Sequence, residues 1–185
     1  MKLHELVARF AAAAESAAPM NAVRGILENL RAELAALERG LAFIPGVGGN
    51  ARQLFYRSPQ VSLLKVSFPA GRRTPPHDHG AWAAILLLSG EEMNTLYLRD
   101  GGTLRRAGEK LLLPGSILTM RADTIHVAES RGGAPAVGLH AYGGDLLELP
   151  RRMWNPQTLE EHPLDAERYE LFAQAASAAD AAPFP

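Results

Sequence analysis

The sequence TPPHDHGAWAAILLLSG, at residues 74–90, places a histidine on each side of an aspartate and follows them with small and then apolar residues. In an extended chain, side chains two positions apart point to the same side, so His77 and His79 project together while Asp78 points away. Four small or apolar residues share the histidine side: Ala81, Ala83, Ile85 and Leu87. The pattern predicts a chelating pair that opens onto apolar walls, although two neighbouring histidines can also form an exposed polar strand edge.

The chain around this stretch, from about residue 52 to 149, consists of short runs rich in Val, Ile, Leu, Phe and Tyr. Turn clusters such as RDGGT and ESRGGAP separate these runs. Many short strands at such spacing predict an antiparallel sandwich or barrel, in which strands distant in sequence lie side by side.

Both ends of the chain predict helices, because their apolar residues recur at helical spacing. One stripe is formed by Leu3, Leu6, Val7 and Phe10, and a longer one by Val23, Ile26, Leu27, Leu30, Leu34, Leu37 and Leu41. Pro19 separates the two and Gly40 is expected to end the second. A third helix is expected to begin after Asp165, a good N-cap residue.

These patterns together predict a single domain, because the length of 185 residues suits one core. The expected parts are a helical N-terminal extension at 1–42, a β-barrel core at 51–150 and a C-terminal segment with a helix at 151–185. The glycine-rich PGVGGN at 45–50 lacks the Lys-Ser/Thr of a phosphate-binding loop and is interpreted as a connector. The final APFP is interpreted as a loose tail.

Composition excludes several classes of function. The formal charge is -1, with 19 Lys plus Arg against 20 Asp plus Glu, so no basic field favours nucleic acid. The absence of cysteine excludes disulfides and thiolate ligands. No apolar run approaches the roughly 18 residues of a membrane helix. We expect a soluble, cytoplasmic protein that acts on a small molecule, as a monomer or small homo-oligomer.

The remaining histidines differ in what their surroundings predict. His4 and His162 lie in polar contexts and are interpreted as solvated surface residues. His126, at the start of a predicted strand, can complete a site with the first pair, and three imidazoles suit Zn, Fe, Cu or Ni and leave open coordination positions. His140 and Tyr142, two apart on one strand, are either packed core residues or a hydrogen-bonded pair that positions a substrate.

These residues resemble the cupin superfamily, whose fold is a double-stranded β-helix, or jelly-roll barrel. Its first motif begins with a glycine, followed after five residues by His-x-His. A glutamate comes three or four residues later, and a second glycine six residues after that. The residues that match are Gly71, His77, His79 and Gly90. The glutamate position is Ala83, so the frequent three-histidine, one-carboxylate site of cupins cannot form. The second motif is matched by Gly108, Pro114, Gly115 and His126, with Ser130 where asparagine is usual. The resemblance implies a mainly β fold with helices added at both ends.

Within the cupins, HDHGAW and LHAYGGDL are similar to segments of the thiol dioxygenases, the family of cysteine dioxygenase and 3-mercaptopropionate dioxygenase. The resemblance covers roughly residues 51–155. It implies Fe(II) bound by His77, His79 and His126, and a substrate and oxygen environment formed by His140 and Tyr142. The implied reaction converts a small thiol and O2 to a sulfinic acid.

The family grips the substrate carboxylate with an arginine or a glutamine one strand before the HDH segment. The best alignment puts Gln53 at this position, and Arg52 and Arg57 are close enough in sequence for a slip of register to place either of them there. Gly138 replaces a family serine that would orient the histidine of the Ser-x-His-x-Tyr segment, and Ala51 replaces a tyrosine of the cysteine enzymes. With no cysteine for a Cys–Tyr crosslink, a cysteine dioxygenase proper is disfavoured.

Three neutral ligands leave the full charge of the cation uncompensated, which favours an anionic ligand such as a thiolate. Two alternatives stay open at this point. One is a metal-dependent cupin of another class, such as an isomerase or a carbon-directed oxygenase. The other is a non-catalytic small-molecule sensor.

Overall fold

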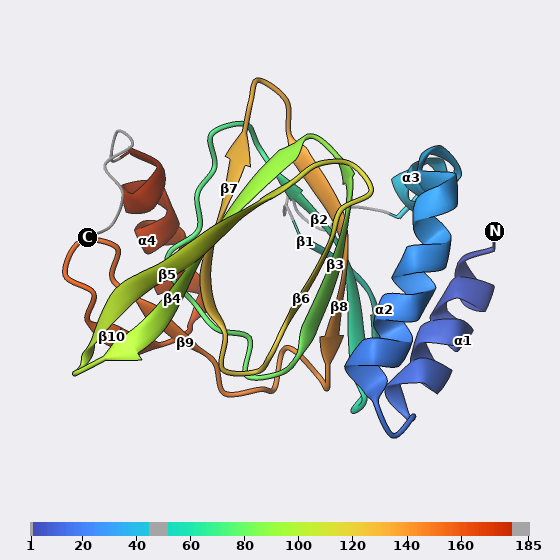
Figure 1. Ribbon diagram of the computed structural model, residues 1–185, viewed down its shortest axis with the longest axis horizontal. Helices are drawn as coiled ribbons and strands as arrows, with labels where there is room; N and C mark the ends of the chain where they lie inside the picture. The colour runs from blue at the N-terminus through green and yellow to red at the C-terminus, as the bar shows by residue number, and fades with distance from the viewer. Residues whose placement is uncertain (1, 45–51, 179–185) are drawn as a thin grey trace.

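The computed structural model describes residues 2–44 and 52–178. The predicted connector at 45–50, Ala51 and the predicted tail at 182–185 lie outside the described residues. The described chain forms a β-barrel with helices at both ends (Figure 1).

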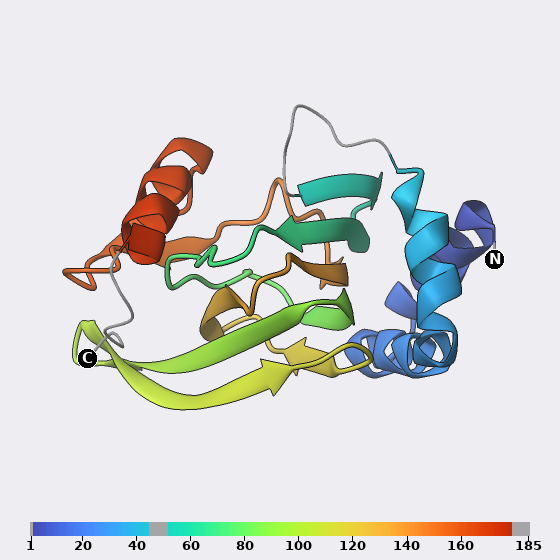
Figure 2. The same ribbon diagram turned by 90° about the horizontal axis from the view of Figure 1, so that it is seen from above.

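Two sheets face each other and form the two layers of the barrel (Figure 2). The first has the strand order β1-β2-β8-β3-β6, and the second contains β5-β4-β7. The strands of the first sheet are β1 (Arg52–Arg57), β2 (Val61–Phe68), β3 (Ala83–Ser89), β6 (Ile117–Met120) and β8 (Ala136–Gly143). Those of the second are β4 (Glu91–Asp100), β5 (Thr103–Leu112) and β7 (Ile125–Arg131).

The segment between β2 and β3, which contains the HDH sequence, adds a further extended chain to the second sheet. Isolated bridges join Arg73 to Glu129 and His77 to His126, both on β7. From β2 onward, the order is therefore β2-β8-β3-β6 in one sheet and 73–77, β7, β4, β5 in the other. This is the strand order of a jelly roll, and the protein has the expected cupin double-stranded β-helix.

The HDH segment differs from the expectation of a regular strand. His77 makes reciprocal backbone hydrogen bonds with His126, at 3.0 Å each, but regular pairing begins only at Ala83. Gly80 lies between them with a φ of +63°, a conformation that L side chains rarely adopt. The backbone turns here, and Ala83, Ile85 and Leu87 still face the barrel interior, as the alternation predicts.

The N-terminal helices cover the outer face of the five-stranded sheet (Figure 1). They are α1 (Leu3–Ala14), α2 (Pro19–Leu30) and α3 (Leu34–Ala42), with a 3-10 turn at Arg31–Glu33. Leu6, Phe10 and Leu27 pack against alternate residues of β2, β3 and β8 that point away from the barrel. The second predicted helix is thus two helices, and Gly40 lies inside α3 instead of ending it.

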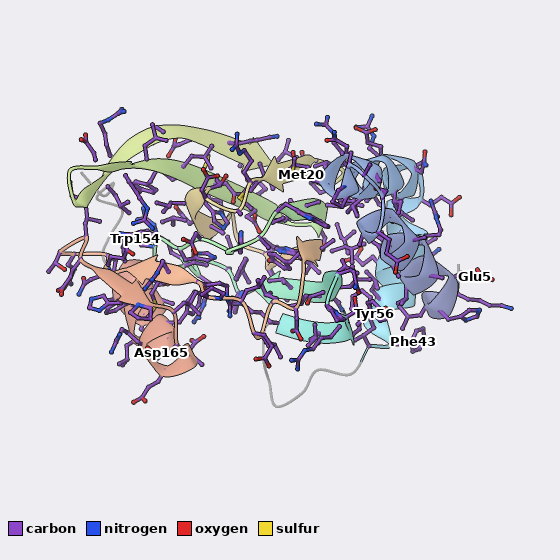
Figure 3. The ribbon with its side chains drawn as sticks, turned by 90° about the horizontal axis from the view of Figure 1, so that it is seen from below. Glu5, Met20, Phe43, Tyr56, Trp154 and Asp165 are labelled. Carbon is purple, nitrogen blue, oxygen red and sulfur yellow. The ribbon has the colours of Figure 1, made fainter. Side chains whose placement is uncertain are left out.

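The C-terminal part lies at the opposite end of the barrel, where Figure 3 shows Trp154 and Asp165 far from Glu5 and Phe43. It contains β9 (Arg152–Trp154), β10 (Glu161–Pro163) and α4 (Ala166–Ala178). The Asp165 carboxylate accepts a hydrogen bond from the Arg168 N–H at 2.8 Å, so it is the expected N-cap. In the described part of the chain, no helix combines the length and apolar character needed to cross a membrane.

Candidate metal centre

Three buried histidines meet inside the barrel. The first two come from the segment before β3, and His126 comes from β7, which the backbone pairing holds against His77. Each offers one ring nitrogen, and these three atoms all lie within 4.8 Å of one another. The structure therefore brings together the three residues that the sequence predicts as metal ligands, and they could hold a metal ion.

Hydrogen bonds at the outer ring nitrogens orient two of the three rings. Nδ1 of His77 lies 3.0 Å from the carbonyl oxygen of Pro75, and Nδ1 of His126 lies 2.8 Å from Oδ1 of Asn94. Because both oxygens can only accept, each Nδ1 carries the proton and each Nε2 keeps its lone pair. Such partners fix the tautomer and direction of a metal-binding histidine.

The support of His126 extends one residue further. Asn94 donates from Nδ2 to Oε1 of Glu92 at 2.8 Å, and both side chains are buried on β4. This donation also fixes the orientation of the amide, so that its oxygen faces His126. Burial raises the pKa of Glu92 above its usual range, while the hydrogen bond from Asn94 opposes the shift.

The three rings are uncharged at neutral pH. Burial, followed by the repulsion of His126, lowers the pKa of His77 well below 6.5. Burial and the other two imidazoles do the same for His79. Burial, with a smaller contribution from Arg52, lowers the pKa of His126 to about 4. Neutral imidazole is the form that binds a metal ion.

One pair of ring nitrogens has the spacing expected for two ligands of one transition-metal ion. Nε2 of His126 lies 3.4 Å from Nε2 of His79. Two nitrogens bound to one ion at about 2.1 Å and a near-tetrahedral angle would lie about 3.4 Å apart. Nδ1 of His79 is buried without a hydrogen-bond partner among the described residues. The donor set suits Zn, Fe, Cu or Ni and excludes the oxygen-rich sites of Mg and Ca.

The predicted His140 and Tyr142 pair lies beside the three histidines. Nδ1 of His140 is 2.8 Å from the Tyr142 hydroxyl, and the Tyr142 ring centre is 4.9 Å from that of His79. Burial, with a smaller effect of Arg52, lowers the pKa of His140 to about 3, and burial raises that of Tyr142, so both are neutral. The hydrogen-bonded pair is therefore formed, and it faces the candidate metal site.

Gly138 makes room for His140. A Cβ atom at this position would lie 2.7 Å from Nε2 of His140, which is too close for an unchanged ring position. Nε2 itself has no hydrogen-bond partner among the described residues. Because Gly138 lacks the hydroxyl of the serine that the resembling family has here, Nε2 of His140 stays without a hydrogen-bond partner among the described residues of the barrel interior.

A cavity joins these residues, with a volume of about 470 Å³ that includes its open mouth. Apolar side chains form much of its wall: Leu64, Val66, Phe68, Ile85, Ala128 and Leu146. Its polar residues are Arg52, His77, His79, Glu92, His126, His140, Tyr142 and Arg151. An apolar wall that carries a few convergent polar groups is typical of a small-molecule site.

The structure places Arg52, and not Gln53, on the cavity wall. Arg52 pairs with Val66, a cavity residue, whereas Gln53 pairs with Lys65, whose Nζ donates to the backbone of α3 at Leu41. Neighbouring strand residues face opposite sides, so one register step separates the two. The preferred anchor, Gln53, thus faces away from the site. Arg57 is paired with Asp145 near the surface.

Three residues around the site were not among those predicted: Glu92, Arg151 and Tyr169. Tyr169, from α4, lies edge-on to His77 at 5.6 Å between ring centres and carries the Arg52 guanidinium 4.3 Å above its ring. None belongs to a local motif that could have marked it in the sequence. Only the fold brings β4, the segment before β9 and α4 together.

The aspartate of the HDH segment points away from the site, as predicted. Its carboxylate accepts the backbone N–H of Arg152 at 2.8 Å, and its own N–H donates to the Arg152 carbonyl at 3.0 Å. Asp78 thus attaches the HDH segment to β9. His4 is exposed, as expected, but His162 is only partly so, because its ring packs 5.6 Å from that of Phe172.

Comparison with protein-family models finds no match. Several solved structures are similar, among them the DMSP lyase DddQ from Ruegeria pomeroyi, with 24% identity, 51% coverage of this chain and a TM-score of 0.41. The match covers 43% of the lyase, so this chain spans less than half of it.

Two further solved structures match this chain over most of their own length. A double-stranded β-helix protein from Klebsiella pneumoniae is 14% identical, with a TM-score of 0.47. The match covers 60% of this chain and 85% of the Klebsiella protein. An RmlC-like cupin from Methanocaldococcus jannaschii has 13% identity, coverage of 58% and 91%, and a TM-score of 0.46. The strand order described above, and not these similarities, carries the fold assignment.

Proposed function

We propose that the protein is a non-heme iron thiol dioxygenase that converts a small thiol and O2 to a sulfinic acid. The carrying observation is the arrangement of a neutral three-histidine group beside the hydrogen-bonded His140 and Tyr142 in one cavity. The resemblance of the HDH and His-x-Tyr segments to thiol dioxygenases gives this arrangement its chemical interpretation.

His77, His79 and His126 would hold iron(II). The ion would supply a binding position for the thiol sulfur, whose proton it displaces, and the electrons that make O2 reactive. The three ligands are neutral, so no carboxylate of the ligand set competes with the anionic sulfur for the ion. The overall reaction balances as one thiol and one O2 giving one sulfinic acid.

The remaining residues would position the substrate and control protons. Arg52, held over the ring of Tyr169, offers paired N–H donors to a substrate carboxylate. The Tyr142 hydroxyl, fixed by His140, directs a hydrogen bond into the cavity and stays protonated because burial raises its pKa. The apolar wall limits the access of water.

The deciding experiment is anaerobic loading with iron(II), followed by oxygen uptake with 3-mercaptopropionate, cysteine and cysteamine and detection of the sulfinate by mass spectrometry. Thiol-dependent uptake with one sulfinate formed per O2 is expected. Protein that retains no near-stoichiometric iron, or that consumes O2 without thiol, would refute the proposal.

One observation favours a second candidate, a metal-dependent isomerase of the cupin fold. Glu92 places a buried carboxyl with a raised pKa on the cavity wall, which suits proton transfer to and from carbon. Such an enzyme would retain metal and turn over without O2, so the same oxygen-uptake assay separates the two.

A further inference from the structure

Two arginines line the cavity from opposite parts of the chain. Arg52 comes from β1, and Arg151 comes from the segment just before β9. Both act on the same groups, because each contributes to the electrostatic environment of Tyr142 and of His77. The cavity therefore contains two guanidinium groups beside the three histidines.

Neither guanidinium forms an ion pair with a carboxylate of the described residues. The acidic charges that act on them are Glu170 for Arg52 and Asp78 for Arg151, and these carboxylates already bind Arg72 and the Arg152 N–H. Among residues 2–44 and 52–178, ion pairs occupy other arginines such as Arg57, Arg72 and Arg99, but none involves Arg52 or Arg151. Glu92 is the one carboxylate among the described cavity residues, and it is already bonded to Asn94. Partly buried cations without a counter-ion are costly, and a bound anion would offset that cost.

The Arg52 side chain and the Arg151 backbone are held in place from outside the cavity. Arg52 lies over the ring of Tyr169, and the Arg72–Glu170 ion pair at 2.7 Å fixes α4 beneath it. The Arg151 carbonyl accepts the Leu164 N–H at 2.9 Å.

The chain before Arg151 also lies against Gly80 of the HDH segment. A Cβ there would be only 2.6 Å from the Pro150 carbonyl oxygen, so the close approach requires glycine. The position of Arg151 at the cavity is thus built into the backbone and does not depend on a flexible side chain alone.

The charges of the site indicate how many anionic groups a ligand would carry. The histidines are neutral, so a divalent metal ion and two guanidinium groups supply the positive charge. A thiolate and a single carboxylate would leave one guanidinium without a counter-ion. A second carboxylate would satisfy it, because arginine binds carboxylates through paired N–H donors.

We propose that the site takes a small dicarboxylate, with one carboxylate on Arg52 and the other on Arg151. The inference rests on the proposed function for the third group of the substrate, the thiol, and so names a mercapto-dicarboxylate as the substrate class.

The first test uses anions without a thiol, so that it does not depend on catalysis. Titration calorimetry compares succinate with propionate on the full-length, metal-loaded protein. Succinate is expected to bind at least about tenfold more tightly, as one additional charge-assisted contact of 1.4 kcal/mol would give. Equal affinity for the two anions would overturn the dicarboxylate inference.

The second test assigns the two anionic positions. Arg151→Gln is expected to reduce succinate affinity to within about threefold of propionate while leaving propionate binding unchanged. Arg152→Gln is the matched control, because this neighbouring arginine is exposed and pairs with Glu161. If Arg151→Gln instead weakens both anions equally, the two arginines share one carboxylate and the inference fails.

The catalytic comparison separates this inference from the proposed function. Mercaptosuccinate is expected to have a KM at least about tenfold below that of 3-mercaptopropionate, and Arg151→Gln should remove the difference. If no thiol supports oxygen uptake but succinate still binds more tightly than propionate, the thiol chemistry fails and the dicarboxylate site stands. If 3-mercaptopropionate is the better substrate and succinate binds no better than propionate, the thiol dioxygenase function stands and the dicarboxylate inference fails.

Discussion

Replacement of Asn94 tests whether the hydrogen bonds behind His126 set the metal affinity. The amide accepts the Nδ1–H of His126 at 2.8 Å and donates to Glu92 at 2.8 Å, and all three side chains are buried. Asn94→Ala removes both contacts and leaves the His126 N–H without a partner. The ring then loses the group that fixes its tautomer and direction.

The expected loss has two parts. Removing such a partner lowers metal affinity by about 10- to 100-fold, or about 1.4–2.7 kcal/mol. An unsatisfied buried N–H lowers the free energy of unfolding of the metal-free protein by about 1–3 kcal/mol. Competition with a chelator measures the first quantity, and urea unfolding of the metal-free protein measures the second.

Two further variants make the test specific. Asn94→Asp keeps an oxygen for His126 but loses the donor to Glu92, so it should recover most of the metal affinity. Asn21→Ala makes the same change at an exposed position of α2 and should alter neither quantity. The reasoning is refuted if folded Asn94→Ala binds metal within twofold of the unchanged protein.

Three further outcomes are expected. His77→Ala should abolish retention of the metal, measured by elemental analysis, whereas His4→Ala on the exposed face of α1 should not; equal retention in both would contradict the ligand assignment. Tyr142→Phe should keep the metal but lower kcat by about 10- to 100-fold, since only the hydroxyl bonded to His140 is lost, and unchanged kinetics would remove its role. In metal-free protein, the pKa values of about 4 for His126 and about 3 for His140 lie below that of unfolded histidine, about 6.5, so the unfolded chain takes up protons first. The free energy of unfolding should be highest above pH 6.5 and fall by up to about 1.4 kcal/mol per histidine and pH unit toward pH 4, and a urea midpoint that is flat over this range would contradict it.

The predicted fold and most of the predicted site depend on short-range patterns. Alternation in the HDH segment and in β8 correctly predicts that His77 and His79 share a side, and that His140 and Tyr142 do. Apolar periodicity finds the terminal helices, and Asp165 marks the start of α4. Periodicity alone does not predict the 3-10 turn that divides α2 from α3, because the apolar stripe continues through it.

Short-range patterns do not decide whether Arg52 or Gln53 faces the cavity. Alternation states that the two side chains face opposite sides, but the pairing of β1 with β2 decides which side is the cavity. A register shift of one residue would exchange their roles. The resemblance to known families left this register open, and the structure places Arg52 at the cavity.

By itself, the sequence determined the local chelating pair, the side to which Asp78 turns and the chemical type of the ligands, because these follow from backbone geometry and residue identity. Tertiary structure alone decided that Glu92, Arg151 and Tyr169 surround the site. They come from β4, the segment before β9 and α4, and no spacing along the chain relates them. Their meeting depends on long-range strand pairing and helix docking. It adds to the three histidines a cavity with two guanidinium groups that form no ion pair with the described residues.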